Sequence, residues 1–343
     1  MRYFRIKRWP GIVLGILFVV SGVVKAVDPI GLSYKTGEYL SMFQLSGWSG
    51  LSVIFAILLC TVEMTLGLLL LLRLWRRVTA LAVMFFILGF TILTYLIYTD
   101  PYGGINECGC FGEAIHLSNG TTFAKNMVLL VVAGFHLWNV FRRKKNPFNY
   151  RQVGLTLGML AVAFLVPLYS YFYLPPFDFL PYNVGTRIGA ENTISFYDVD
   201  FNDFTEKVFT DDKPAYMVGL KQEITPMESR KLTALHKAYT KGKVNLFVAT
   251  SQNGIRIPRY DDIPVYLMDG VALKSVLRTS AGVVAFTADR HIAGKWNLSY
   301  TPYRFDRRYG EELTWERWKR GMFFGMLLLV VALLFYGRKK LGE

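Results

Sequence analysis

The sequence predicts an α-helical membrane protein that carries one soluble α/β domain. Hydrophobic residues make up 52% of the 343 residues and charged residues 19%, whereas about 25% of an ordinary soluble chain is charged. The mean hydropathy is +0.30. The net charge of +14 is compatible with nucleic-acid binding. However, the basic residues lie beside apolar runs, so we expect no nucleic-acid partner.

Six apolar runs approach or exceed the length of about 18 residues that indicates a transmembrane helix. They are residues 11–27, 51–72, 78–98, 123–141, 153–173 and 321–336. The first is short, and the basic stretch before it is also compatible with the start of a signal peptide. We favour a retained helix, because no small-residue cleavage site follows and Lys25 interrupts the run.

Basic residues at the ends of these runs predict the orientation. Cytoplasmic loops of membrane proteins are rich in Lys and Arg, and with six spans all fifteen of the flanking basic residues fall on one side. They are Arg2, Arg5, Lys7, Arg8, Arg73, Arg76, Arg77, Arg142, Arg143, Lys144, Lys145, Arg151, Arg338, Lys339 and Lys340. We therefore expect a bacterial inner-membrane protein with both termini in the cytoplasm and its soluble domain in the periplasm.

The spans divide the chain into four parts. Residues 1–145 form a four-helix membrane domain, and residues 146–174 form a linker and the fifth helix. Residues 175–319 form the soluble domain, in which basic and acidic residues nearly balance. Residues 320–343 form the sixth helix and a basic cytoplasmic tail.

The soluble part shows strand and helix patterns in the order β-α-β, then β-α-β-β. The expected strands are 215–220, 244–249, 263–268, 283–286 and 291–296, and the expected helices are 226–239, capped by Thr225, and 272–277. This order resembles a thioredoxin-like domain. Such enzymes carry a Cys-x-x-Cys pair between the first central strand and its helix, but here residues 221–226 hold no cysteine. Residues 279–282 also lack the usual proline, so the resemblance implies a domain that holds a partner and exchanges no disulfides.

Cys108 and Cys110 are the residues with the clearest chemistry. They lie in Glu107-Cys-Gly-Cys-Phe-Gly-Glu113, in a loop that the orientation places in the oxidising compartment. A bridge across one residue closes a small ring whose strain makes it labile, and labile disulfides are suited to exchange. At the membrane surface, such a pair could meet both a soluble thiol protein and a lipid-soluble quinone. The third cysteine, Cys60, falls inside the second helix, where a small buried hydrophobic role is favoured.

Other polar residues in the apolar runs are weaker candidates. Glu63 lies three residues after Cys60, and an ionisable group inside a membrane is a functional hypothesis by default. Lys25 lies near the outer end of the first helix, where snorkelling to the interface is slightly favoured over a site role. His116 could complete a metal site with the two loop cysteines, but three ligands at this spacing are unlike structural zinc sites, and we predict no metal. His136 in the fourth helix is expected to be a satisfied polar group.

The first 145 residues resemble DoxX-like membrane proteins, and within them the MauE, or methylamine-utilisation, branch. The resemblance rests on Ser21–Lys25 with Asp28-Pro29 after the first span, Glu63 with Gly67 in the second, and Cys-Gly-Cys-Phe-Gly at 108–112. Joined to a thioredoxin-like domain, the arrangement resembles a Bacteroidetes-type DoxX family protein. The resemblance implies disulfide handling in exported proteins, by analogy with quinone-linked thiol oxidases. Those enzymes normally use two cysteine pairs, whereas this chain has one.

Three functions are therefore compatible with the sequence. The first is an inner-membrane thiol-disulfide oxidoreductase or disulfide-maturation factor that uses Cys108 and Cys110, with Glu63 and Lys25 as further site residues, quinone as acceptor and an exported thiol protein as partner. The second is a non-enzymatic membrane scaffold whose periplasmic domain recruits an envelope protein. The third is a handler of a metal or small molecule.

Overall fold

The computed structural model describes residues 9–99, 117–143, 149–189, 194–209, 213–255, 257–299 and 312–341. The chain forms two compact units. One contains residues 1–170 and 323–343, and the other contains residues 171–322.

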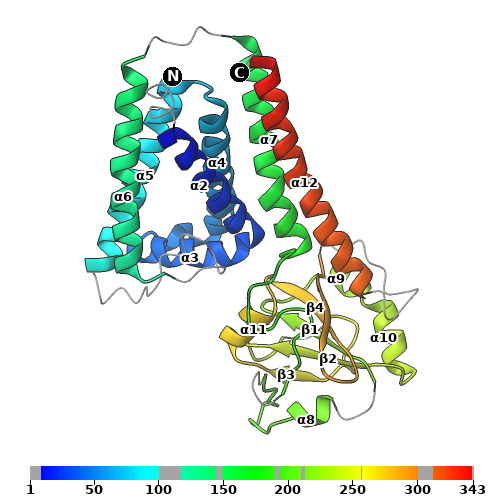
Figure 1. The fold of residues 1–343 in the computed structure, drawn as a ribbon. Coiled ribbons are helices and arrows are strands. Elements are labelled where there is room, and N and C mark those ends of the chain that lie inside the picture. The colour runs from blue at the N-terminus through cyan, green and yellow to red at the C-terminus, as the bar shows by residue number, and fades with distance from the viewer. Residues whose placement is uncertain are drawn as a thin grey trace. The chain divides into compact units, whose positions relative to one another are not determined.

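Six helices in the described residues are long and apolar enough to cross a membrane, which confirms the six predicted runs. They are α2 (Trp9–Val27), α4 (Ser52–Leu72), α5 (Arg76–Thr99), α6 (Asn119–Phe141), α7 (Tyr150–Tyr173) and α12 (Glu312–Leu341). Within the first unit, α2 packs against α4, and α5 packs along α6 (Figure 1).

A further helix follows α2, in the segment between the first two predicted spans. Helix α3 spans Pro29–Met42, and the 3-10 turn η1 spans Ser46–Leu51. Asp28 caps α3, because its Oδ1 accepts a hydrogen bond of 2.8 Å from the amide of Gly31, and Pro29 occupies the first turn, where proline is tolerated. Leu32 is buried, and α3 packs against α4. The run is too polar to be found by a search for membrane spans, but its cap is an ordinary helix signal.

Two glycines allow α2 and α4 to approach closely. A Cβ atom at Gly67 would lie 2.7 Å from the backbone nitrogen of Val19 and 2.8 Å from the carbonyl oxygen of Gly15. A Cβ atom at Gly22 would lie 2.6 Å from Cγ of Met64. Small residues at helix contacts are a common basis of packing in membranes, where lipid offers apolar side chains no drive to associate.

The second unit contains a mixed five-stranded sheet, in agreement with the predicted α/β class. Its strands are β1 (Ala215–Leu220), β2 (Asn245–Thr250), β3 (Val265–Leu267), β4 (Ala281–Phe286) and β5 (Ile292–Asn297). Their order is β3-β2-β1-β4-β5. Strands β1, β2 and β3 are parallel, whereas β4 is antiparallel to both β1 and β5.

Both faces of this sheet are covered. Tyr216 and Val218 of β1 face a core that includes Leu235 of α10 (Thr233–Thr240). Met217 faces the other core, which includes Leu273 of α11 (Gly270–Val276). Burial on both faces explains why β1 is apolar throughout. A short helix, α8, spans Thr205–Val208.

The predicted helix 226–239 is divided in the structure. Helix α9 spans Pro226–Arg230 and α10 begins at Thr233. The amides of Lys231 and Leu232 bond to carbonyls three residues back, which is the tighter 3-10 pattern. The predicted cap is confirmed, because Thr225 and Glu228 form a reciprocal capping box.

The α2–α4 contact predicts that Gly67→Ala destabilises the membrane unit. The added methyl would meet backbone atoms, and overpacking of this kind costs about 1 to 3 kcal/mol. The measurement is thermal unfolding of the detergent-solubilised protein, monitored by the monodisperse size-exclusion peak that remains after heating. The variant should have a lower midpoint temperature than the wild type. The matched control is Gly89→Ala on α5, where a Cβ meets no atom within 4 Å. It should leave the midpoint unchanged or raise it, since alanine favours helix. Equal midpoints for the two variants would contradict the close approach.

Candidate intramembrane site

Lys25 and Glu63 form a buried ion pair between two predicted membrane spans. Lys25 Nζ lies 2.6 Å from Glu63 Oε2, and the two side chains are only 4% and 6% exposed. Lys25 Nζ also donates to Ser21 Oγ at 3.2 Å, one turn back on α2, and lies 5.5 Å from the ring centroid of Phe90. The ammonium group therefore has a carboxylate, a hydroxyl and an aromatic ring around it.

The expectation that Lys25 snorkels to the interface is wrong. Its side chain turns inward to Glu63, because α2 and α4 approach closely enough for the two charged groups to meet. A charge in hydrocarbon costs several kcal/mol, and pairing is the usual way to reduce that cost. Both residues were predicted from the sequence on separate grounds, and their pairing is a finding of the structure.

The ion pair lies in the wall of a pocket of about 100 Å³. Helices α2, α4, α5 and α6 all contribute, with Leu17, Phe18, Ser21, Lys25, Glu63, Phe86, Ile87, Phe90, Lys125, Asn126 and Leu129 as lining residues. Apolar and aromatic side chains with a few polar groups are typical of small-molecule sites. At about 100 Å³ the pocket is smaller than the usual range of about 300 to 1,000 Å³ for such sites.

Two polar residues of the pocket, Asn126 and Lys125, were not predicted from the sequence. Asn126 is 5% exposed, and its Nδ2 donates to Thr94 Oγ1 at 3.2 Å and to the carbonyl of Phe90 at 3.4 Å. These bonds join α6 to α5 beside the pocket. Two adjacent polar residues near the start of an otherwise apolar run were the available signal.

The structure describes only some of the other residues that the sequence singled out. Cys60 is a free cysteine that is fully buried, as expected for a small hydrophobic residue. Cys108, Cys110 and His116 lie outside the described residues. Within the described ranges, no group of three or more His, Cys, Asp or Glu side chains is placed to hold a metal. His136 packs beside Gly11, where a Cβ atom would lie 2.5 Å from its ring.

The segment that would hold a redox pair in a thioredoxin-like enzyme has a different composition here. Lys221 follows β1, its amide donates to Ser280, and its Nζ donates to the carbonyl of Leu277 at 2.6 Å. Thr225 and Glu228 then cap α9. The residues between β1 and α9 thus provide hydrogen bonds and no thiol.

The six apolar helices and the mixed-sheet unit define a multi-pass membrane protein with an additional α/β domain. A family model described as methylamine utilisation protein MauE matches residues 5–139, about two fifths of the chain. The predicted MauE-like resemblance is thus supported for the membrane region that contains the ion pair.

Two further comparisons identify similar proteins. Protein TlpB from Flavobacterium psychrophilum is 26% identical over 159 residues, which cover 45% of this chain and 42% of that protein. The chain therefore matches less than half the length of this curated relative. A solved structure from Aquifex aeolicus VF5, assigned to electron transfer, is 17% identical and covers 40% of this chain and 99% of its own. Its TM-score of 0.27 is too low to support any structural argument.

The ion pair predicts strong coupling between Lys25 and Glu63. Lys25→Met or Glu63→Met alone should lower the free energy of unfolding by about 3 to 5 kcal/mol, because each leaves a buried charge unpaired. The double variant should lie closer to the wild type than either single variant does. Unfolding midpoints in detergent would measure this cycle.

An exposed pair on α3 supplies the control cycle. Lys35 Nζ lies 3.1 Å from Glu38 Oε2, with side chains 29% and 45% exposed. Methionine at these positions should show coupling of no more than about 0.5 kcal/mol. Similar coupling energies in the two cycles would contradict a buried pair at Lys25 and Glu63.

Proposed function

We propose that this protein takes part in the oxidation or maturation of thiols in exported proteins, as an inner-membrane thiol-disulfide oxidoreductase that uses Cys108 and Cys110. The observation that carries the proposal is the buried Lys25–Glu63 pair in the wall of an apolar pocket. An ion pair maintained inside a membrane is a strong indication of a functional site.

The position of the pocket along the chain connects it to the cysteines. Phe90 is nine residues from the end of α5 at Thr99, and Asn126 is seven residues from the start of α6 at Asn119. At 1.5 Å per residue these separations are about 10 to 14 Å. Cys108 and Cys110 belong to the segment that joins these two helix ends. The pocket and the cysteine segment are therefore associated with the same end of the α5–α6 pair.

The proposed reaction is a two-electron exchange. A substrate thiolate attacks one sulfur of the Cys108–Cys110 disulfide and forms a mixed disulfide, and the second substrate thiolate then displaces that sulfur. The substrate leaves as a disulfide, and Cys108 and Cys110 are left as thiols. A lipid-soluble quinone would accept the two electrons and two protons that restore the bridge. Lys25, Glu63 and Asn126 would bind its polar groups, and Phe86 and Phe90 its ring.

The orientation required by this reaction follows the distribution of basic residues. We propose an inner-membrane location with both termini in the cytoplasm, which places the 108–110 segment and the second unit in the periplasm. There a substrate thiol protein and an oxidising environment are both available.

The second unit is proposed to be thioredoxin-like and to bind a partner. Its central β1 lies between a parallel strand and an antiparallel strand, and a capped helix follows β1, which supports this proposal. Residues 171–322 contain no cysteine. This unit therefore recruits or orients an exported protein, and the membrane unit performs any exchange.

The absence of thiols from that unit also favours a second candidate function. In it, the whole protein is a non-enzymatic scaffold, and the two loop cysteines only stabilise their segment. The two functions differ in whether Cys108 and Cys110 become covalently joined to another protein.

We expect Cys108→Ser or Cys110→Ser to accumulate a mixed disulfide with an exported protein in intact cells. In each serine variant the remaining cysteine can still attack the disulfide of an oxidised client and form a mixed disulfide, which is the reverse of the proposed reaction. The neighbouring thiol that would release this adduct by closing the 108–110 bridge is absent. Non-reducing electrophoresis after acid quenching and alkylation would detect the adduct as a band that a reductant removes. Cys60→Ala is the matched control, since Cys60 is fully buried, and this variant should give no adduct.

The two functions give opposite results in this experiment. Permanently reduced loop cysteines, with no adduct in either serine variant, would contradict the oxidoreductase. If removal of residues 175–319 then also abolished client maturation, the scaffold would be supported.

A further inference from the structure

The second unit contains a basic pocket that is separate from the intramembrane site. Its volume is about 260 Å³. Its described lining residues are Leu174, Pro175, Pro176, Phe177, Asp178, Phe179, Asn183, Val184, Val276, Arg278, Lys295, Lys319 and Arg320. Four of these side chains are basic and one is acidic, so the described lining carries an excess of three positive charges.

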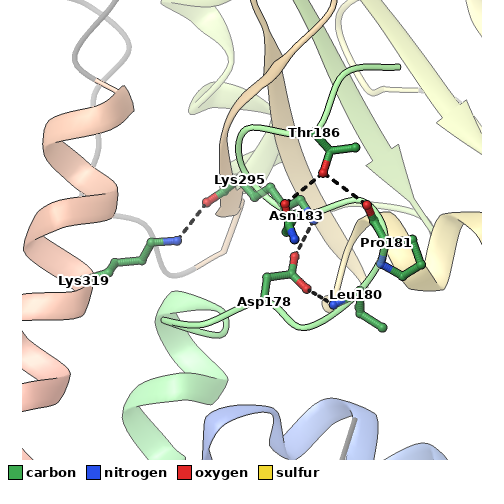
Figure 2. A network of polar contacts seen from close by, with 7 residues as sticks. All are labelled: Asp178, Leu180, Pro181, Asn183, Thr186, Lys295 and Lys319. Carbon is green, nitrogen blue, oxygen red and sulfur yellow. Dashed lines mark hydrogen bonds and ion pairs between the residues drawn. The ribbon is translucent and has the colours of Figure 1, made fainter. Parts of the chain in front are cut away.

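Most of this positive charge is buried. Arg278 is 7% exposed, Lys295 6% and Lys319 2%. Lys295 Nζ pairs with Asp178 Oδ2 at 2.6 Å, and the other oxygen of Asp178 accepts from the amide of Leu180 at 3.1 Å (Figure 2). Lys319 Nζ lies 3.5 Å from the carbonyl of Lys295, as Figure 2 also shows. Asp178 is the one acidic side chain among the described lining residues and pairs with Lys295, so an anion that entered the pocket would meet mainly cationic side chains.

Two predicted membrane spans, α7 and α12, contribute lining residues in or directly next to their ends. Leu174 directly follows the last residue of α7, Tyr173. Lys319 and Arg320 lie in the first turn of the apolar span Arg317–Gly337. Residues at the ends of membrane spans lie at the level of the lipid headgroups. Basic pockets between transmembrane helices bind anionic headgroups on the cytoplasmic side of membranes, and the same chemistry would apply at the ends of these two spans.

We infer that this pocket binds a phosphate-bearing anion. Arginine presents a planar fork of donors that matches phosphate oxygens, and lysine adds point charge. The volume lies just below the usual range for ligand pockets of about 300 to 1,000 Å³, which fits a headgroup-sized anion. The phosphate belongs either to an anionic phospholipid or to a small soluble compound.

Native mass spectrometry of the full-length protein in a neutral detergent tests this inference. The probes are phosphatidylglycerol, zwitterionic phosphatidylcholine and inorganic phosphate. The variants are Arg278→Gln, which removes a buried lining charge, and Arg320→Gln, which removes an exposed one. Arg317→Gln is the matched control, because Arg317 is also exposed on α12 but does not line the pocket.

We expect phosphatidylglycerol to bind more tightly than phosphatidylcholine. Arg278→Gln and Arg320→Gln should weaken that binding at least about tenfold, as expected for the loss of a charged hydrogen bond. Arg317→Gln should weaken it no more than about fivefold, which is the contribution of one surface charge near lipid. If inorganic phosphate alone raises the unfolding midpoint, and Arg320→Gln removes the rise, the ligand is a soluble phosphate compound.

Two results would overturn the inference. One is equal weakening by Arg317→Gln and Arg320→Gln, which would indicate nonspecific surface charge. The other is equal binding of the two lipids by the wild type together with no response to inorganic phosphate. Because Arg320 is exposed, its replacement leaves the core intact, and a negative result cannot be assigned to misfolding.

Discussion

The pairing of Lys25 with Glu63 is the constraint on which the membrane unit depends. Each charge alone would cost several kcal/mol inside a bilayer, so the two side chains must meet wherever their helices cross. That meeting requires α2 and α4 to approach within the distance that Gly22 and Gly67 allow. Sequence, packing and electrostatics therefore converge on one contact, and helices α5 and α6 complete the pocket beside it.

Elements that depend on local pattern were predictable from the sequence. The six apolar runs became helices, and strand 215–220 was predicted with its observed bounds, because continuous apolar sequence specifies burial directly. Helix α3 was missed, since its sequence is more polar than the six spans and has no long apolar run.

The composition of the site was predictable only in part. Lys25 and Glu63 were both selected as ionisable residues in apolar surroundings, but they are 38 positions apart. Which residue a buried lysine meets depends on helix rotation and crossing, and a single sequence carries neither. Asn126 was missed for a related reason, because its partner on α5, Thr94, becomes a neighbour only after α5 and α6 pack.

Direct measurement of the Lys25–Glu63 distance in lipid bilayers tests the central claim most closely. Solid-state NMR with ¹⁵N at Lys25 Nζ and ¹³C at the Glu63 carboxyl would report their dipolar coupling in the full-length protein. The account predicts a coupling that corresponds to a separation of no more than about 4 Å, the range of an ion pair. No measurable coupling, with Lys25 Nζ instead close to lipid phosphate, would contradict it.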